Sequence, residues 1–483
     1  MKSGMIAKEQ DEGNYLLEGS RRNHFLRAAG VGILAGVIAV AFQISLDYAE
    51  QGRIAVLTLL HRELVWGWMV LPVIAAALGA GAAYITARFA PAASGSGIPH
   101  IRAVLAGKRT LDWRRILPVK FLAGVFALGA GFSMGREGPT VQMGACVGAG
   151  LSDALQLDHH ARRNLIASAA GAGLGAAFNA PLAGFIFVIE ELQREISPFT
   201  LVSALIASVF AVAVSRVFTG QLPSFHIHGF PLPPLTALPL FALMGLFAGY
   251  AGVFFNGTLL RALKFSSRLR LQMWQKAAIV GAVTGLVGWW LPSALGGGHR
   301  VAEGILRGDF ASSNLILFLI VLLLGKFCLT ILGYASGIPG GVFAPLLVLG
   351  AIIGQLFGHV SAAMFPNAGA TPAAYAVVCM AAIFTSTIRA PLTGIVLILE
   401  MTGNQEQLFA LILTCLVAYL VAEHARSLPL YDALLEFDLA KDSRAGSVEL
   451  DSEALLAHTH HQIHNQDTAI EEKASPGYVV HPL

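Results

Sequence analysis

Charged side chains are scarce in this chain. Asp, Glu, Lys and Arg make up 13% of its 483 residues, against roughly 25% in an average soluble domain. None occurs between residues 217 and 260 or between 327 and 388, although about 20 apolar residues are enough to cross a bilayer. This shortage excludes an ordinary soluble enzyme. It predicts an integral membrane protein with several successive spans.

Cysteine is equally rare. The chain has four, far apart in apolar sequence and without the paired spacing of a disulfide framework or a metal site: Cys146, Cys328, Cys379 and Cys415. We interpret them as small hydrophobic side chains and expect no metal, no cofactor and no redox role. Residues 1–24 also lack the apolar run of a secretory signal, so we expect them to form a cytoplasmic N-terminal segment.

The few charges are unevenly distributed. Residues 432–483 carry ten acidic and three basic side chains, which leaves a net charge of +10 for residues 1–431. Basic loops are typical of the cytoplasmic side of membrane proteins, and we expect no nucleic-acid partner. The acidic tail holds four histidines between residues 458 and 464. We interpret it as a cytoplasmic extension, with a weak metal-binding tract as the alternative.

Glycine and proline interrupt the apolar sequence at residues 94–99, 135–139 and 337–345. Irregular backbone at membrane depth is tolerated only where protein buries it or where it lines a cavity. The sequence therefore predicts tilted and partial helices whose ends meet inside the membrane.

The chain contains an internal repeat. NAPLAG at residues 179–184, followed by an apolar run to Glu190, recurs 210 residues later as RAPLTG at 389–394, followed by a run to Glu400. We expect a transmembrane domain over residues 25–431, with repeats of roughly 25–215 and 236–431. Duplicated halves with interrupted segments are typical of secondary transporters, whose site lies between the halves. The repeat alone does not show whether the halves are inverted.

Each interrupted segment combines exposed backbone with a following apolar helix. The amides at helix N-termini bind anions through their free N–H groups and the positive end of the helix dipole. They do so without a buried cation that would hold the ion too tightly for passage. The alternative for each segment is that its glycines serve only helix packing and turns.

Five motifs together resemble the CLC family of chloride channels and chloride/proton antiporters. They are GSGIP at 95–99, GREGP at 135–139, NAPLAG at 179–184, GIPGGVFAP at 337–345 and the PLY that ends at Tyr431. The resemblance implies an all-α membrane fold of about 18 tilted and partial helices in two inverted repeats. It also implies a homodimer with one pathway per subunit, in the inner membrane with both termini cytoplasmic.

By this resemblance, the hydroxyls of Ser96 and Tyr431 and the amides of Val342 and Phe343 bind chloride. Neutral donors replace the hydration shell of the ion, whereas a full opposite charge at low dielectric would trap it. The family position of Ser96 is proline in relatives that prefer nitrate, so we expect this chain to prefer chloride.

The resemblance also assigns two carboxylates. Glu137 corresponds to the gating glutamate, which competes with chloride when charged and leaves when protonated. Glu191 corresponds to the internal proton-transfer glutamate, and it favours an antiporter over a passive voltage-gated or pH-gated chloride channel of the same family. Glu400 is interpreted as a structural acid at a helix end.

The chain departs from its relatives after GSGIP, where they carry acidic residues and this sequence has His100 and Arg102. The local proton route can therefore differ. Lys326 stands where a basic residue is common before the third glycine segment, as a contributor to the electric field. We expect no regulation through a paired nucleotide-sensing module after Tyr431.

Two short patterns suggest other functions. GFSMG at residues 131–135 matches the G-x-S-x-G pattern of serine hydrolases, but its flanks are helical rather than strand-like and most histidines lie elsewhere. The glycines at 171, 173 and 175 imitate a dinucleotide-binding loop without the strand that such a loop requires. We interpret them as helix-packing residues and expect a protein that is not an enzyme.

Overall fold

A computed structural model describes the backbone of residues 2–441, except residues 64, 195–196, 226–228, 230, 311–313 and 367–369, and side chains from residue 22 onward. Its contacts divide the chain into one unit of residues 1–431 and another of residues 432–483. In the second unit, residues 432–441 are helical. The histidines predicted to mark the acidic tail lie outside the described residues.

The first unit is helical. Its helices are α1 (Lys2–Glu63), α2 (Gly67–Phe89), α3 (Ile98–Leu105), α4 (Trp113–Gly129), α5 (Glu137–Ala154), α6 (His159–Phe178), α7 (Pro181–Phe187), α8 (Pro198–Thr219), α9 (Leu238–Arg268), α10 (Met273–Trp290), α11 (His299–Arg307), α12 (Leu315–Ala335), α13 (Phe343–Met364), α14 (Pro372–Ile388), α15 (Pro391–Thr402) and α16 (Leu408–His424). A π-helical segment, η2 (Val188–Gln193), follows α7, and short 3-10 turns occupy η1 (Pro91–Ala93), η3 (Leu235–Ala237), η4 (Pro292–Ala294) and η6 (Gln405–Gln407). The only β-structure in the described part of the chain is one bridge between Gly135 and Gly341.

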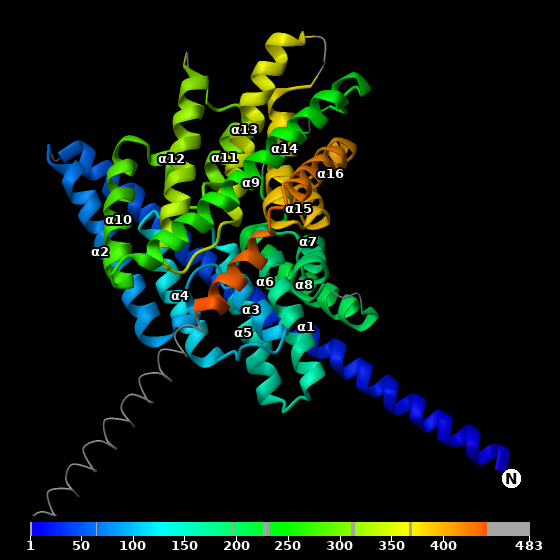
Figure 1. The fold of residues 1–483 in the computed structure, drawn as a ribbon. Helices are drawn as coiled ribbons and strands as arrows, with labels where there is room; N and C mark the ends of the chain where they lie inside the picture. Colours follow the sequence, from blue (N-terminus) through cyan, green and yellow to red (C-terminus); the bar gives the residue numbers. More distant parts are fainter. Residues whose placement is uncertain are drawn as a thin grey trace, which may run out of the picture. The chain divides into compact units, whose positions relative to one another are not determined.

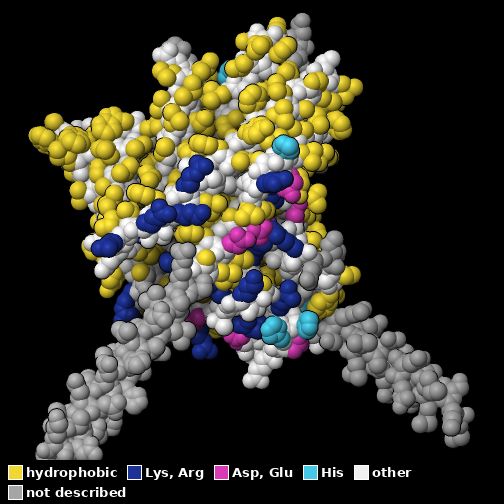
Figure 2. Space-filling view, viewed as in Figure 1, with side chains coloured by type: hydrophobic (Ala, Val, Ile, Leu, Met, Phe, Trp, Pro, Cys, Tyr) yellow, Lys and Arg dark blue, Asp and Glu magenta, His cyan; other side chains and the backbone are white. Residues whose placement is uncertain are grey.

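The surface of this unit is suited to lipid. Seven helices in the described residues are long and apolar enough to cross a membrane: α1, α2, α8, α9, α12, α13 and α16. Hydrophobic side chains cover much of the face shown in Figure 2, and Lys and Arg gather in a band across it. Many large hydrophobic side chains of these helices are exposed, and in a soluble monomer contiguous apolar surface of this kind marks contact with a membrane or a partner. The predicted multi-pass membrane protein is confirmed.

Helix α1 is longer than the apolar pattern indicates. Its span runs from Arg22 to Glu63 over 42 residues, which corresponds to about 63 Å, twice the roughly 30 Å hydrocarbon core. The apolar run that the sequence shows ends near residue 46, because Asp47, Glu50 and Arg53 follow it. These charged residues stay helical and line a cavity instead of ending the span.

The predicted interruptions are confirmed. Segment 94–97 separates η1 from α3, segment 130–136 separates α4 from α5, and segment 336–342 separates α12 from α13. Gly97 shows why the first requires glycine: its φ is +85°, and an added Cβ would meet the side chain of Gln142. Positive φ is cheap only for glycine.

The repeat is reflected in two reciprocal contacts between helices that lie together in Figure 1, α7 and α15. The Glu190 carboxylate accepts hydrogen bonds from the amides of Leu392 and Thr393 at the start of α15, at 3.0 and 2.7 Å. Glu400 in turn accepts from Leu182 and Ala183 at the start of α7, at 3.1 and 2.8 Å.

Glu190 follows α7 and Glu400 lies in the last turn of α15. Each caps the N-terminus of the other helix, which places the two helices antiparallel. This arrangement agrees with inverted repeats. It also gives Glu400 the structural place at a helix terminus that the sequence predicts.

Small residues bring α5 and α6 into backbone contact, which fixes the position of the second glycine segment. A Cβ added to Gly173 would lie 2.3 Å from the Thr140 carbonyl, and one added to Gly144 would lie 2.3 Å from the Ala169 carbonyl. The glycine run at 171–175 therefore serves helix packing, as predicted, because small side chains let helix backbones approach closely.

Candidate functional site

The three glycine segments meet at one place. Gly135 and Gly341 exchange backbone hydrogen bonds of 2.6 and 2.8 Å. The Gly340 amide donates to the Gly95 carbonyl at 3.0 Å, and the Gly95 amide donates to Gly337 at 3.3 Å. These contacts bring together the N-termini of α3, α5 and α13. The first amides of a helix have no acceptor within it, so three sets of N–H groups converge in the protein interior.

Ser96 lies at this convergence. Its side chain is 1% exposed, and its Oγ accepts a hydrogen bond of 3.3 Å from the Ile98 amide. The contact uses the oxygen as acceptor, so the O–H group remains able to donate. Gly138 packs directly against Ser96, and a Cβ there would lie 3.0 Å from Oγ. The close approach of α5 to Ser96 therefore depends on glycine.

Tyr431 reaches the same region from the end of the first unit. The side chain is fully buried, and its hydroxyl has no partner of acceptable hydrogen-bond geometry among the described residues. The side chain of Ser96 lies near this hydroxyl, and the carboxylates of Glu137 and Glu191 are close enough to interact with it electrostatically. A buried hydroxyl without a partner is costly. Tyr431 therefore offers a donor to a ligand.

Val342 and Phe343 begin α13, and both are fully buried. The Phe343 ring is held by three others, with centroids at 5.8 Å from Phe178, 6.0 Å from Phe187 and 4.5 Å from Phe384. This aromatic packing fixes the first turn of α13 and the direction of its amides. A rigid set of donors suits the binding of an anion.

Glu137 is the first residue of α5 and is 4% exposed. The backbone amides of Glu137 itself and of Ala344 lie close enough to stabilise its carboxylate. Its Oε2 has no hydrogen-bond partner in the part of the chain that the structure describes. The carboxylate thus occupies the point where the N-termini of α5 and α13 meet.

A cavity of about 300 Å³ leads to Glu137. Three arginines line it, Arg53, Arg136 and Arg300, together with the acidic side chains of Asp47 and Glu50. With Glu137 itself, the lining holds three cationic and three acidic side chains, so it carries no excess of positive charge. The cavity reaches the Glu137 end of the site.

Glu191 lies in the π-helical segment η2 and is 1% exposed. Its Oε1 accepts a hydrogen bond of 2.7 Å from Arg102 Nη1, in an ion pair that is itself buried. Glu190, next to it, turns away to cap α15. Two adjacent carboxylates therefore have separate surroundings.

Comparison with known proteins identifies the family. The family model described as voltage gated chloride channel matches residues 78–423. The chain belongs to this family, the CLC family. The H(+)/Cl(-) exchange transporter ClcA of Yersinia pseudotuberculosis is 37% identical over 442 residues, covering 90% of this chain and 91% of that protein. ClcA of Klebsiella pneumoniae is 37% identical over 426 residues, covering 86% and 89%.

Solved structures agree on the fold. A slow cyanobacterial Cl-/H+ antiporter superposes with a TM-score of 0.83 at 35% identity and covers 87% of this chain and 99% of its own. A CLC-type fluoride/proton antiporter gives a TM-score of 0.70 at 22% identity, covering 85% and 97%, and supports the fold alone. The predicted all-α CLC fold is confirmed, and these relatives are transporters rather than enzymes.

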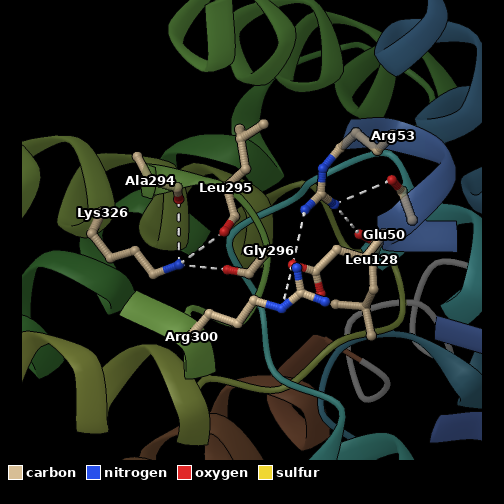
Figure 3. A network of polar contacts seen from close by, with 9 residues as sticks. Glu50, Arg53, Leu128, Ala294, Leu295, Gly296, Arg300 and Lys326 are labelled. Atoms are coloured by element: carbon tan, nitrogen blue, oxygen red, sulfur yellow. Dashed lines mark hydrogen bonds and ion pairs between the residues drawn. The ribbon is translucent and has the colours of Figure 1, made fainter. Parts of the chain in front are cut away.

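A second polar network supports the cavity beside Glu137 in this CLC chain (Figure 3). The buried Lys326 ammonium donates to the carbonyls of Ala294, Leu295 and Gly296. Arg53 donates to the Leu128 carbonyl at 3.2 Å and lies 3.8 Å from Glu50. Lys326 thus fixes the loop that lines the cavity, a contact that its place in the sequence does not reveal.

Lys120 does the same for the loop that carries Ser96. It is fully buried in α4 and donates to the carbonyls of Ala93 and Gly95, at 2.9 and 2.7 Å. Lys120 belongs to none of the glycine-containing motifs of the sequence. The available signal is a lone lysine inside an apolar helix, since buried charges persist only with partners.

Replacing Lys120 by methionine is expected to lower both stability and chloride flux. Each carbonyl left without a donor costs about 1–3 kcal/mol, and the loop before Ser96 loses its anchor. Thermal unfolding in detergent and flux in proteoliposomes measure the two effects. Lys264→Met, at an exposed position on α9, is the control. Unchanged stability and flux in Lys120→Met would show that Lys120 does not anchor the loop.

The serine of the hydrolase-like pattern has a different role. The Ser133 hydroxyl shares a hydrogen bond of 2.8 Å with Thr330, and this contact joins the segment before α5 to α12. The partner is a hydroxyl and not an imidazole, so the pair provides no general base for a nucleophile.

Proposed function

We propose that this chain is a secondary active transporter that exchanges chloride for protons. The observation that carries the proposal is the buried Glu137 carboxylate, held where the N-termini of α5 and α13 converge. The helix N-termini form a place that suits an anion, and the Glu137 carboxylate, which a proton can neutralise, occupies it. Proton and anion occupancy are linked wherever a single site accepts either a carboxylate or a chloride ion.

Chloride would bind next to Glu137, between Ser96, Tyr431 and the amides of Val342 and Phe343. The support is chemical: two hydroxyls able to donate and the N-terminal amides of α13. All are neutral donors. Such donors compensate for lost hydration without holding the ion too tightly to leave.

Glu137 would act as gate and proton carrier. When it is ionised, its carboxylate competes with chloride for the N-terminal amides. Protonation removes the charge that made it compete, so the side chain yields the position to the ion. The cavity that reaches Glu137 provides an entry for both ions.

Glu191 would transfer protons between Glu137 and the cytoplasm. The support for this role is the location of Glu191. Its carboxylate is buried, and both Glu191 and Glu137 are close enough to Tyr431 to interact with it electrostatically. The proton and chloride routes would then share the region of Tyr431 and separate beyond it.

Ser96→Pro is expected to shift the anion preference from chloride towards nitrate. The substitution removes the O–H donor and the Ser96 Oγ contact with the Ile98 amide, so a site tuned for a small ion accepts a larger planar one. Zero-current voltages in mixed chloride and nitrate gradients measure the preference. Voltages that do not move, or a wild type that already prefers nitrate, would contradict the assignment of Ser96.

The alternative is a passive chloride channel of the same family. The two functions differ in their response to pH under voltage clamp. For an exchanger, the zero-current voltage shifts when pH changes on one side at fixed chloride, because proton movement is part of the cycle. For a channel, that voltage depends on chloride alone.

We further propose the arrangement of the whole chain. Residues 25–431 would form the transmembrane domain, in repeats of roughly 25–215 and 236–431, and residues 1–24 and 432–483 would be cytoplasmic segments. The location would be the inner membrane, and two copies would form a homodimer with one pathway in each subunit. The support is the internal repeat and the family membership of the chain.

A further inference from the structure

Arg102 and Glu191 form a buried ion pair between α3 and η2. Arg102 Nη1 lies 2.7 Å from Glu191 Oε1, and the two side chains are 9% and 1% exposed. Helix α3 begins two residues after Ser96. The pair therefore ties the carboxylate that we propose as a proton carrier to the short helix that positions a proposed chloride ligand.

Among the described residues, the helices packed against the segment that carries Glu191 are α3, α6 and α7. On α3, His100 is also buried. On η2 and its end, Glu190 is directed to α15, and Arg194 lies 3.8 Å from Glu191 Oε2. Helix α7 has no ionisable side chain, and those of α6 fall in its first five residues. The hydroxyl of Tyr431 is within reach of the charge.

Of these groups, Arg102 makes the shortest contact that is also shielded from water. Arg194 is 44% exposed, so solvent screens its charge. A buried carboxylate without a partner tends to become neutral, whereas an opposite charge within about 4–6 Å favours its ionised form. Burial thus favours the neutral form of Glu191, and the nearby arginine favours its ionised form. Because the contact with Arg102 is only 2.7 Å long, we expect the ionised form to prevail.

We propose that Arg102 is a positioning residue for proton entry, which holds Glu191 ionised and in one orientation. Loading a proton onto Glu191 then requires the ion pair to loosen. Because Arg102 belongs to α3, this step also releases a restraint on the helix that follows Ser96. The inference rests on the proposed role of Glu191. In it, Arg102 opposes proton uptake by stabilising the ionised carboxylate.

The test is the pH dependence of proton flux in proteoliposomes of the full chain. The pH is varied on the cytoplasmic side, from which Glu191 is proposed to take up protons. Arg102→Gln is expected to move the pH of half-maximal proton flux upward by about 1–3 units, because a carboxylate without its cation accepts a proton more readily. Arg102→Lys keeps the charge and is expected to restore most of the wild-type profile. Arg194→Gln, which removes an exposed cation at a longer distance, is the matched control.

Glu191→Gln, measured in parallel, separates the two proposals. If it uncouples transport while Arg102→Gln keeps the wild-type pH profile, Arg102 has no role in proton entry. If Glu191→Gln stays fully coupled, the proposed role of Glu191 is wrong. A purely structural role for Arg102 would change protein yield or chloride flux without moving the pH profile.

Infrared spectra of the wild type give a measure that does not depend on the folding of any arginine variant. A protonated-carboxyl band that is present in the wild type and missing in Glu191→Gln belongs to Glu191. We expect such a band only at acidic pH and none near neutral pH, because Arg102 keeps Glu191 ionised there. A protonated Glu191 under that condition would overturn the proposal.

Discussion

Replacing Glu137 by glutamine is expected to leave chloride flux and to abolish proton movement driven by a chloride gradient. Glutamine has nearly the same size as glutamate, but it can neither carry a proton nor compete as an anion for the amides of α5 and α13. The proton-to-chloride ratio should fall to zero, because no second acidic group occupies this point among the described residues lining the convergence. Simultaneous recordings of chloride and pH in proteoliposomes measure the ratio.

Glu303→Gln is a suitable control for that experiment. Glu303 lies on α11 and pairs with Arg307 at 2.6 Å, outside the convergence of helix N-termini. Its replacement should leave the ratio unchanged. Uphill proton transport that persists in Glu137→Gln would show that the gating carboxylate has been assigned to the wrong residue.

Glu191→Gln is expected to preserve chloride transport and to remove proton coupling. The amide keeps size and polarity but cannot cycle a proton, and chloride does not need the side chain in order to bind near Tyr431. Glu190→Gln is the matched control, since it makes the same chemical change one residue away. Glu190 bonds the start of α15 instead of facing α3, so its replacement should cost some stability and leave coupling largely intact.

The comparison of these two variants under one chloride gradient is informative in both directions. Normal coupling in Glu191→Gln would show that another group carries the proton. Loss of coupling in both variants would indicate that η2 as a whole, and not one carboxylate, is required. The expected result is loss in one and retention in the other.

The parts of the site that the sequence predicts are those encoded in short segments. Glycine and proline at 94–99, 135–139 and 337–345 mark where helices break, because their backbone preferences are local. Broken helices inside a membrane must meet other protein, so the convergence of their ends also followed. The positions of Ser96, Glu137 and Tyr431 came from resemblance to a family, since no local pattern distinguishes a ligand hydroxyl from a structural one.

Contacts between distant segments were not predictable in this way. Arg102 and Glu191 are 89 residues apart in the sequence, and only packing of α3 against η2 brings them together. Lys120 and Lys326 look like isolated charges in apolar helices. The carbonyls that satisfy them belong to loops whose positions depend on the whole fold.

The orientation of the repeat also needed the structure. A constant offset of 210 residues shows a duplication, yet two copies can be parallel or inverted. The reciprocal caps of Glu190 on α15 and Glu400 on α7 decide in favour of antiparallel helices. Glu190 and Glu400 end equivalent apolar runs in the sequence, and the helix that each one caps becomes visible only in the fold.

The most direct test of the account is uphill proton movement in proteoliposomes of the wild-type chain. Vesicles start with equal pH on both sides and a steep chloride gradient, and the membrane voltage is set so that it does not drive protons in the measured direction. We expect protons to move against their electrochemical gradient while chloride runs down its own, at a constant ratio of the two fluxes. Chloride flux with no uphill proton movement would contradict exchange and leave a passive channel.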